Sequence, residues 1–273
     1  MKRTFTTASS HLLLIVLSLV SLYPLWFVAQ TALKTNSAFI LNPTGIPSAP
    51  TLSNLPALLA QMPFVRWTSN SALVTLISVG AATILSVFAA YAVVFGKFRG
   101  SRAFFSMNIG LMAIPPVALV VPLFAVMVQL RLINTLPSVM LIYTGLLIPF
   151  SVFFLGNFFR ELPRELIEAA TVDGASHARI LIRIVMPLSL PTVFTLVIVN
   201  AIWVWNELLY ALVFLQNNSA RTVMAGLALS QGRFATNEPL IMMGVLLSIL
   251  PMVVLYLASQ RFFIRGMTAG IGK

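Results

Sequence analysis

The sequence contains no cysteine and very little charge. Only 8% of its 273 residues are Asp, Glu, Lys or Arg, whereas about a quarter is usual for a soluble domain. The absence of cysteine excludes disulfides and thiolate chemistry, and the two histidines, His11 and His177, are too few for a histidine-built metal site. Because 59% of the residues are hydrophobic, we predict an integral membrane protein.

Sequence motifs for catalysis and nucleotide binding are also missing. No G-x-x-x-x-G-K-[ST] loop is present, since Gly96-Lys97 is followed by Phe98. There is no HExxH and no nucleophile elbow. We therefore expect a non-enzyme with no catalytic residue, no metal ligand and no cofactor of its own. The net charge of +11 does not call for nucleic acid, because in membrane chains the position of basic residues along the topology matters more.

Six apolar stretches are long enough to cross a bilayer, which takes about 20 helical residues. This predicts an all-α membrane protein with six transmembrane helices in a single transmembrane domain covering 1–273. Lys2 and Arg3 before the first stretch would also suit a signal peptide, but no A-x-A site follows, so we expect a retained helix. Prolines within the stretches predict bends. The stretches are 12–33, 71–95, 103–130, 137–158, 185–215 and 239–263, and these prolines are Pro24, Pro115, Pro116, Pro122 and Pro149.

The basic residues predict the orientation. Twelve of the 17 fall in segments that share a side with the termini, so both termini are expected in the cytoplasm. The outer segment from Lys34 to Asn70 is proline-rich and should be a loop with at most short helices. The twelve are Lys2, Arg3, Lys97, Arg99, Arg102, Arg160, Arg164, Arg179, Arg183, Arg261, Arg265 and Lys273.

The cytoplasmic loop at about 160–184 contains four of the six acidic residues. Pro163 suits a first helical turn and Glu165 suits its positive end, so a short helix should run to about Val172. Asp173-Gly174 then predicts a turn in which Gly174 takes positive φ. A second helix, capped by Ser176 or Asp173, would complete a helix-turn-helix. The alternative is an amphipathic connector that lies on the membrane surface.

Glu168-Ala169-Ala170, then Asp173-Gly174-Ala175, resembles the EAA loop of permease subunits in bacterial ABC importers. Motif, spacing and position two spans before the C-terminus all agree. The resemblance implies that this loop couples the permease to an ATP-binding subunit, and that the protein lies in the inner membrane of a bacterial cell. Glu168, Ala169, Ala170 and Gly174 would dock, and Asp173 would shape the turn.

Further motifs are similar to the carbohydrate-uptake branch of this family, and in particular to the second permease subunit of maltose-type systems. The resemblance implies three kinds of protein partner in addition to the lipid bilayer: a second related permease, two ATP-binding subunits and an extracytoplasmic solute-binding protein. ATP and Mg would be bound by the ATP-binding subunits. The motifs are Asn70-Ser71, Ala89-Ala90-Tyr91-Ala92, Pro122-Leu123-Phe124, Trp205-Asn206-Glu207, Gln260-Arg261-Phe262-Phe263 and Gly266-Met267-Thr268-Ala269-Gly270.

Polar and aromatic residues follow one face of the fifth stretch. Their spacing of i, i+3, i+7 and i+10 puts them together on a continuous helix. Such side chains could line a sugar path, or they could be a polar helix contact with interfacial aromatics. They are Asn200, Trp203, Glu207 and Tyr210.

Small residues at helical spacing in the second stretch favour close helix packing instead of a path. These are Ser71, Thr75, Ser78, Ala82 and Ser86.

The sequence thus favours the permease subunit of an ATP-driven importer for a carbohydrate that the sequence does not name. A secondary transporter would need several ionisable residues within the membrane, and only Glu207 comes close. The remaining alternative is a membrane scaffold whose cytoplasmic loop recruits another partner.

Overall fold

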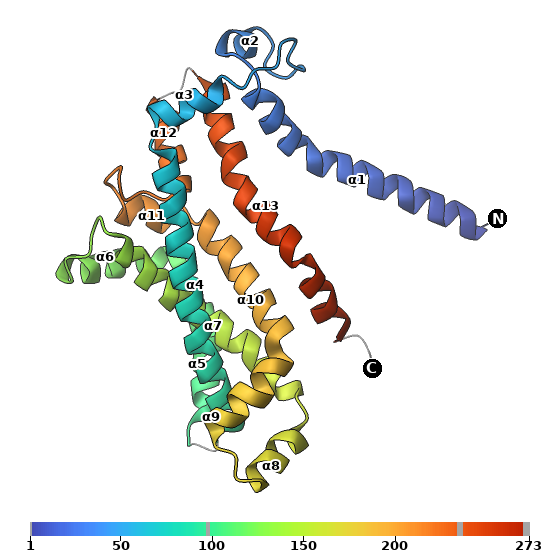
Figure 1. The fold of residues 1–273 in the computed structure, drawn as a ribbon, viewed down its shortest axis with the longest axis vertical. Helices are drawn as coiled ribbons and strands as arrows, with labels where there is room; N and C mark the ends of the chain where they lie inside the picture. The colour runs from blue at the N-terminus through green and yellow to red at the C-terminus, as the bar shows by residue number, and fades with distance from the viewer. Residues whose placement is uncertain (1, 97–98, 234–236, 270–273) are drawn as a thin grey trace. The chain divides into compact units, whose positions relative to one another are not determined.

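The computed structural model describes residues 2–96, 99–233 and 237–269 of the chain, and these residues are helical with no strand (Figure 1). Side chains are described for residues 11–96, 99–232 and 237–259. Several residues considered in the sequence lie outside this description, namely Lys97, Gly270 and Lys273, together with the side chains of the 260–269 motifs.

Among the described residues, five helices or helix combinations are long and apolar enough to cross a membrane, and a bent pair makes a sixth if it counts as one span. The observed count is therefore five or six, against the six expected. The bent pair is α5 (Ser101–Met112) followed by η1 (Pro116–Leu119) and α6 (Val120–Gln129). The five are within α1 (Lys2–Ala32), α4 (Phe64–Phe95), α7 (Leu136–Glu161), the run from α9 (His177–Ile180) to α10 (Met186–Asn206), and α13 (Glu238–Ala269).

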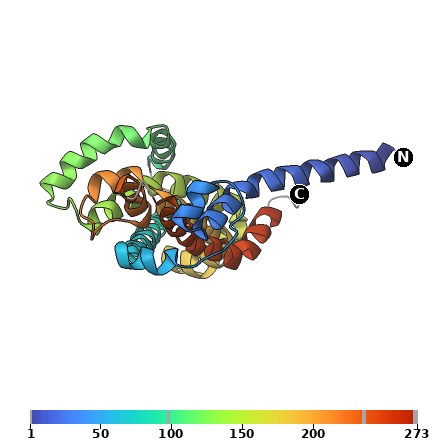
Figure 2. The same ribbon diagram turned by 90° about the horizontal axis from the view of Figure 1, so that it is seen from above.

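The bend in the pair has a local cause. Pro115 has an extended backbone (φ −62°, ψ 129°), as expected for a residue that precedes another proline. The chain turns by 96° across this break, and Figure 2 shows α6 lengthwise while α5 is seen almost end-on. The other prolines that we expected to bend the chain do not interrupt a helix: Pro24 and Pro149 lie inside α1 and α7, and Pro122 lies in the first turn of α6.

The chain divides into two compact units. The first contains residues 1–66 and 225–251. After α1, its connection contains the short helices α2 (Asn36–Leu41) and α3 (Asn54–Gln61), as expected for this proline-rich segment. The rest of the unit is most of α12 (Val223–Arg233) and the first part of α13.

Buried polar side chains fix the connection between α1 and α3. The ammonium of Lys34 is 1% exposed and donates to the carbonyls of Asn42 and Pro43 at 2.9 and 3.0 Å. Asn54 donates to the carbonyls of Ala32 and Lys34 at 2.8 and 2.7 Å. The two bonds from Asn54 give partners to carbonyls at the end of α1 and just after it, which have none within the helix.

The second unit contains residues 67–224 and 252–273 and is organised around α7. Helices α5, α10 and α11 (Leu209–Phe214) all pack against α7. The small-residue stripe of α4 is buried along its whole length, and Ser78 Oγ donates to the carbonyl of Met140 in α7 at 3.3 Å. Close packing is therefore confirmed as the role of this stripe.

Candidate functional site

The loop at 160–184 forms a sharp elbow, which we define as residues 164–180. Helix α8 (Arg164–Val172) ends at Gly174, which has a φ of +75°, as predicted. The amide of Ala175 donates to the carbonyl of Ala170, and that of Gly174 donates to Thr171, both at 3.0 Å. This pair of bonds is the Schellman arrangement, which needs a residue in the left-handed conformation at the position of Gly174.

The second arm of the elbow continues into α10. Ser176 caps α9 by accepting from the amide of Arg179 at 3.4 Å, as predicted, and Asp173 lies at the C-terminal end of α8. A π-helical turn, Leu181–Val185, then joins α9 to α10. Because α9, this turn and α10 follow one another without a loop, displacement of the elbow must be passed to α10.

The elbow also contacts α4 and α7. The hydroxyl of Tyr91 in α4 forms a 3.1 Å hydrogen bond with Nδ1 of His177, and the two rings meet edge to face. Ile180, Leu181 and Val185 are buried in a cluster with Tyr91 and with Phe159 of α7. The elbow is thus anchored on its inner side and cannot move independently of these helices.

The outer side of the elbow is smooth and exposed. Glu168, Ala169, Asp173 and Gly174 are exposed, and so is Val172, at 87%. Ala170 differs from its neighbours, because it is only partly exposed and packs against the buried cluster. The combination of small side chains, two carboxylates and exposed apolar atoms is suited to close contact with another protein.

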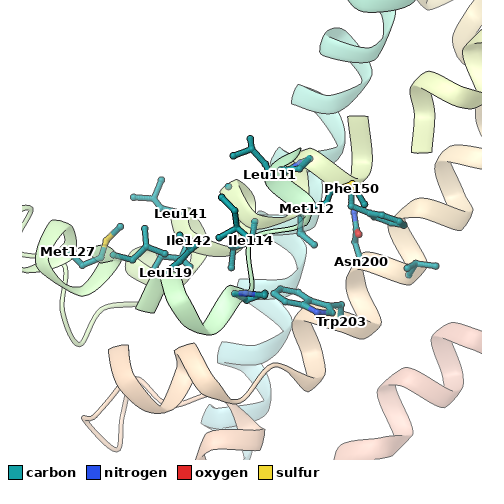
Figure 3. A pocket seen from close by; sticks show the side chains of 17 residues that line it. Leu111, Met112, Ile114, Leu119, Met127, Leu141, Ile142, Phe150, Asn200 and Trp203 are labelled. Atoms are coloured by element: carbon teal, nitrogen blue, oxygen red, sulfur yellow. The ribbon is translucent and has the colours of Figure 1, made fainter. Parts of the chain in front are cut away.

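A cavity of about 620 Å³ lies between the bent pair, α7 and α10 (Figure 3). Its lining is almost wholly apolar, and among the four residues proposed for a sugar path only Asn200 and Trp203 reach it. The amide of Asn200 also donates to Ser151 Oγ at 3.0 Å. The remaining lining residues are Leu111, Met112, Ile114, Pro116, Leu119, Leu123, Met127, Leu141, Ile142, Gly145, Leu146, Leu147, Pro149, Phe150 and Val199.

Glu207 and Tyr210 occupy a different place from the one we expected. Helix α10 ends at Asn206, and Glu207 has an extended backbone (φ −67°, ψ 127°) before α11 begins at Leu209. The interpretation that all four residues share one face of a continuous helix is therefore wrong. The helix ends here because the Glu207 carboxylate accepts bonds from the first amides of α11 and from Tyr143 of α7.

Tyr143 is the residue that sequence reasoning missed. It is fully buried, donates to Glu207 Oε2 at 2.5 Å and meets the ring of Trp203 edge to face at 5.9 Å. Its only signal in the sequence was a phenol within a long apolar run, where a hydroxyl needs a partner. Within the part of the chain that the structure describes, no group of three His, Cys, Asp or Glu side chains could hold a metal ion.

Comparison with known proteins identifies a matching family and similar proteins. Residues 82–269 match the family model described as "Binding-protein-dependent transport system inner membrane component". The chain is 35% identical to the sulfoquinovosyl glycerol transport system permease protein of Agrobacterium fabrum, over 93% of this chain and 90% of that protein. It is 36% identical to the melibiose/raffinose/stachyose import permease protein of Bacillus subtilis, over 75% and 76% of the two chains.

The fold is that of a solved importer. A chain in the crystal structure of a bacterial ABC transporter involved in the import of the acidic polysaccharide alginate superposes with a TM-score of 0.81, at 23% identity, covering 96% of this chain and 97% of that one. With residues 82–269 matched to its model, this multi-pass membrane protein belongs to the family of binding-protein-dependent transport system inner membrane components, the non-enzymatic permease part of such systems.

Proposed function

We propose that this chain is a permease subunit of an ABC importer that carries a carbohydrate across the cytoplasmic membrane. The observation that carries the proposal is the elbow, whose smooth outer side is exposed while its second arm runs directly into a helix of the cavity wall. Family membership and relatives named for sulfoquinovosyl glycerol and for melibiose, raffinose and stachyose support a sugar as the substrate.

The proposed assembly contains this chain, a second related permease, two ATP-binding subunits and an extracytoplasmic solute-binding protein. The family description itself supports a binding-protein partner. The basic residues support an orientation in which both termini and the elbow face the cytoplasm. ATP and Mg belong to the ATP-binding subunits, because the sequence contains no phosphate-binding loop.

Coupling in this proposal is a rigid movement of the elbow. An ATP-binding subunit contacts Glu168, Ala169, Asp173 and Gly174 on the outer side, while Ala170 supports that surface from behind. When the ATP-binding subunits close, the elbow moves and α10 tilts with it. The docking contacts must differ between the open and closed states, because binding of equal strength in both states would not shift the equilibrium between them.

Asn200 and Trp203 are the proposed points of contact with the sugar in this chain. An indole ring gives an apolar face for a sugar ring, and an amide gives a directional hydrogen bond. The rest of the cavity wall is apolar, so further polar contacts must come from the second permease. Glu207 and Tyr210 belong to the same path as supporting residues.

The test is co-purification followed by a two-residue substitution. A tag on this chain should recover an ATP-binding protein in stoichiometric amount, and Glu168→Arg with Ala169→Trp should abolish that recovery without loss of the chain from the membrane. Glu161→Arg, at the end of α7, is the control and should leave recovery intact. Recovery of no ATP-binding protein from the unaltered chain would contradict the proposal and support a membrane scaffold, which the family does not favour.

A further inference from the structure

Glu207 lies at the break between α10 and α11, and its carboxylate accepts hydrogen bonds from three donors. Oε2 accepts from the hydroxyl of Tyr143 at 2.5 Å, and both oxygens lie 3.1 Å from the amide of Tyr210. Oε2 also lies 3.3 Å from the amide of Ala211. These donors direct the carboxylate toward α7 and α11, and Glu207 is not among the residues that line the cavity.

The bonds to α11 explain why the chain can break within an apolar region. The first amides of a helix have no partner within it, and an acceptor placed before the helix satisfies them. A negative charge at this end is favoured by the helix dipole as well. Glu207 thus stabilises the start of α11 while its bond to Tyr143 fixes the break against α7.

Tyr143 connects this break to the cavity. Its ring meets Trp203 at 5.9 Å and Tyr210 at 6.2 Å, both at an interplanar angle of 88°. Trp203 lines the cavity, whereas Tyr143 does not. The position of the indole in the wall therefore depends on a phenol that Glu207 holds in place.

Tyr210 connects the break at Glu207 to the bend between α5 and η1. Its hydroxyl donates to the carbonyl of Pro116 at 2.6 Å, and Pro116 begins η1 and lines the cavity. Ring contact between Phe124 of α6 and Phe214 of α11, at 5.8 Å, joins the two segments further along. The two interruptions of the apolar helices are thus tied together on one side of the cavity.

We infer that Glu207 is a positioning residue for transport. Through Tyr143 it fixes the position of the Trp203 indole, and through Tyr210 it fixes the position of Pro116. The two interrupted helices therefore keep the cavity wall in one conformation. Glu207 does not itself bind the sugar. This inference rests on the proposed function, since it assigns a role within the same path.

Conservative variants separate positioning from direct sugar binding. Tyr143→Phe removes only the donor to Glu207, Tyr210→Phe removes only the donor to Pro116, and Glu207→Leu removes the acceptor while keeping a similar volume. Tyr256→Phe on α13, where the side chain is 52% exposed, is the matched control. Each is reconstituted with its partner subunits, and the maximal rate of sugar uptake is measured beside the basal ATPase rate.

Positioning predicts that Tyr143→Phe slows uptake about tenfold or more, because it loses the charge-assisted bond to Glu207. Glu207→Leu should slow uptake at least as much, because it also loses the bonds to the amides of Tyr210 and Ala211. The double variant should be no slower than the slower single variant, since the two residues act through one contact. Tyr210→Phe should slow uptake by a smaller factor, and Tyr256→Phe should leave it unchanged. A severe effect of Glu207→Leu together with normal uptake by Tyr143→Phe would overturn the inference, because the effect of Glu207 would then not pass through Tyr143.

A labelling experiment reports on the cavity wall itself. The chain has no native cysteine, so Val199→Cys introduces a single thiol into the lining. Its rate of reaction with a methanethiosulfonate reagent should change several-fold when Tyr143→Phe or Glu207→Leu is added, and should be unaffected by Tyr256→Phe. Equal rates in all four proteins would overturn the inference. If the unaltered complex takes up no carbohydrate while labelling still responds, the proposed function fails and the positioning contact stands.

Discussion

Gly174 gives the sharpest single prediction about coupling. Its φ of +75° lies in a region that costs an ordinary L-residue about 1–2 kcal/mol. A Cβ built at this position meets no atom within 4 Å, so the penalty of a substitution is the backbone conformation alone. Gly174→Ala should therefore leave the chain folded but oppose the conformation in which Thr171 and Ala170 accept their bonds across the turn.

The assay is binding of the ATP-binding subunit together with sugar-stimulated ATPase in proteoliposomes. A free-energy penalty of about 1–2 kcal/mol on the elbow conformation that docks corresponds to a loss of affinity for the ATP-binding subunit of about fivefold to thirtyfold. Gly174→Asn should lose less, since Asn adopts positive φ more readily, and Gly174→Val should lose most, since β-branched residues adopt it least.

Gly110→Ala is the matched control for this series. Gly110 lies within α5 and also has no atom within 4 Å of a built Cβ, but it has ordinary helical geometry. It should bind and stimulate as the unaltered chain does. If Gly174→Ala and Gly174→Val matched this control in both affinity and stimulation, the role assigned to the turn would be refuted.

Three further predictions concern packing, charge and the inner side of the elbow. Gly156→Ala should lower the unfolding temperature, unlike Gly110→Ala, because its Cβ would lie 2.9 Å from the Phe105 ring, at a typical overpacking cost of about 1–3 kcal/mol. Burial lowers the pKa of Lys34 below its usual value of 10.5. At pH values between the lowered pKa and 10.5 the unfolded chain binds more protons than the folded chain, so stability rises with pH. Lys34→Met should flatten that rise in thermal unfolding scans, and an unchanged slope would contradict this prediction. Tyr91→Phe loses one hydrogen bond, worth about 0.5–1.5 kcal/mol, to the histidine that begins α9, and should reduce the ratio of stimulated to basal ATPase; a normal ratio would show that α4 does not take part in coupling.

The features that the sequence predicted well are those with a local cause. The turn at Gly174 and the cap at Ser176 follow from residues a few positions apart, and both are confirmed. The bend at Pro115 likewise follows from two adjacent prolines. Close packing along α4 could be anticipated because small residues repeat at the helical period.

The features that sequence reasoning missed depend on contacts between distant residues. No glycine or proline at Glu207 predicts the break in the helix there. The break depends on a hydrogen bond to the carboxylate from Tyr143, which is 64 positions away in the sequence. For the same reason Glu207 and Tyr210 were placed on one helix with Trp203. The inward packing of Ala170 could not be read from a motif either, since it depends on how α8 lies against the buried cluster.

The most direct test of the whole account is sugar-dependent ATPase activity in proteoliposomes. This chain, co-purified with its partners, is reconstituted with the solute-binding protein and challenged with a panel of carbohydrates. The account predicts that one sugar or a small related group stimulates ATP hydrolysis and enters the vesicles, and that Gly174→Val removes the stimulation while basal hydrolysis persists. A preparation that contains every partner yet hydrolyses ATP at the same rate with and without each sugar would contradict it.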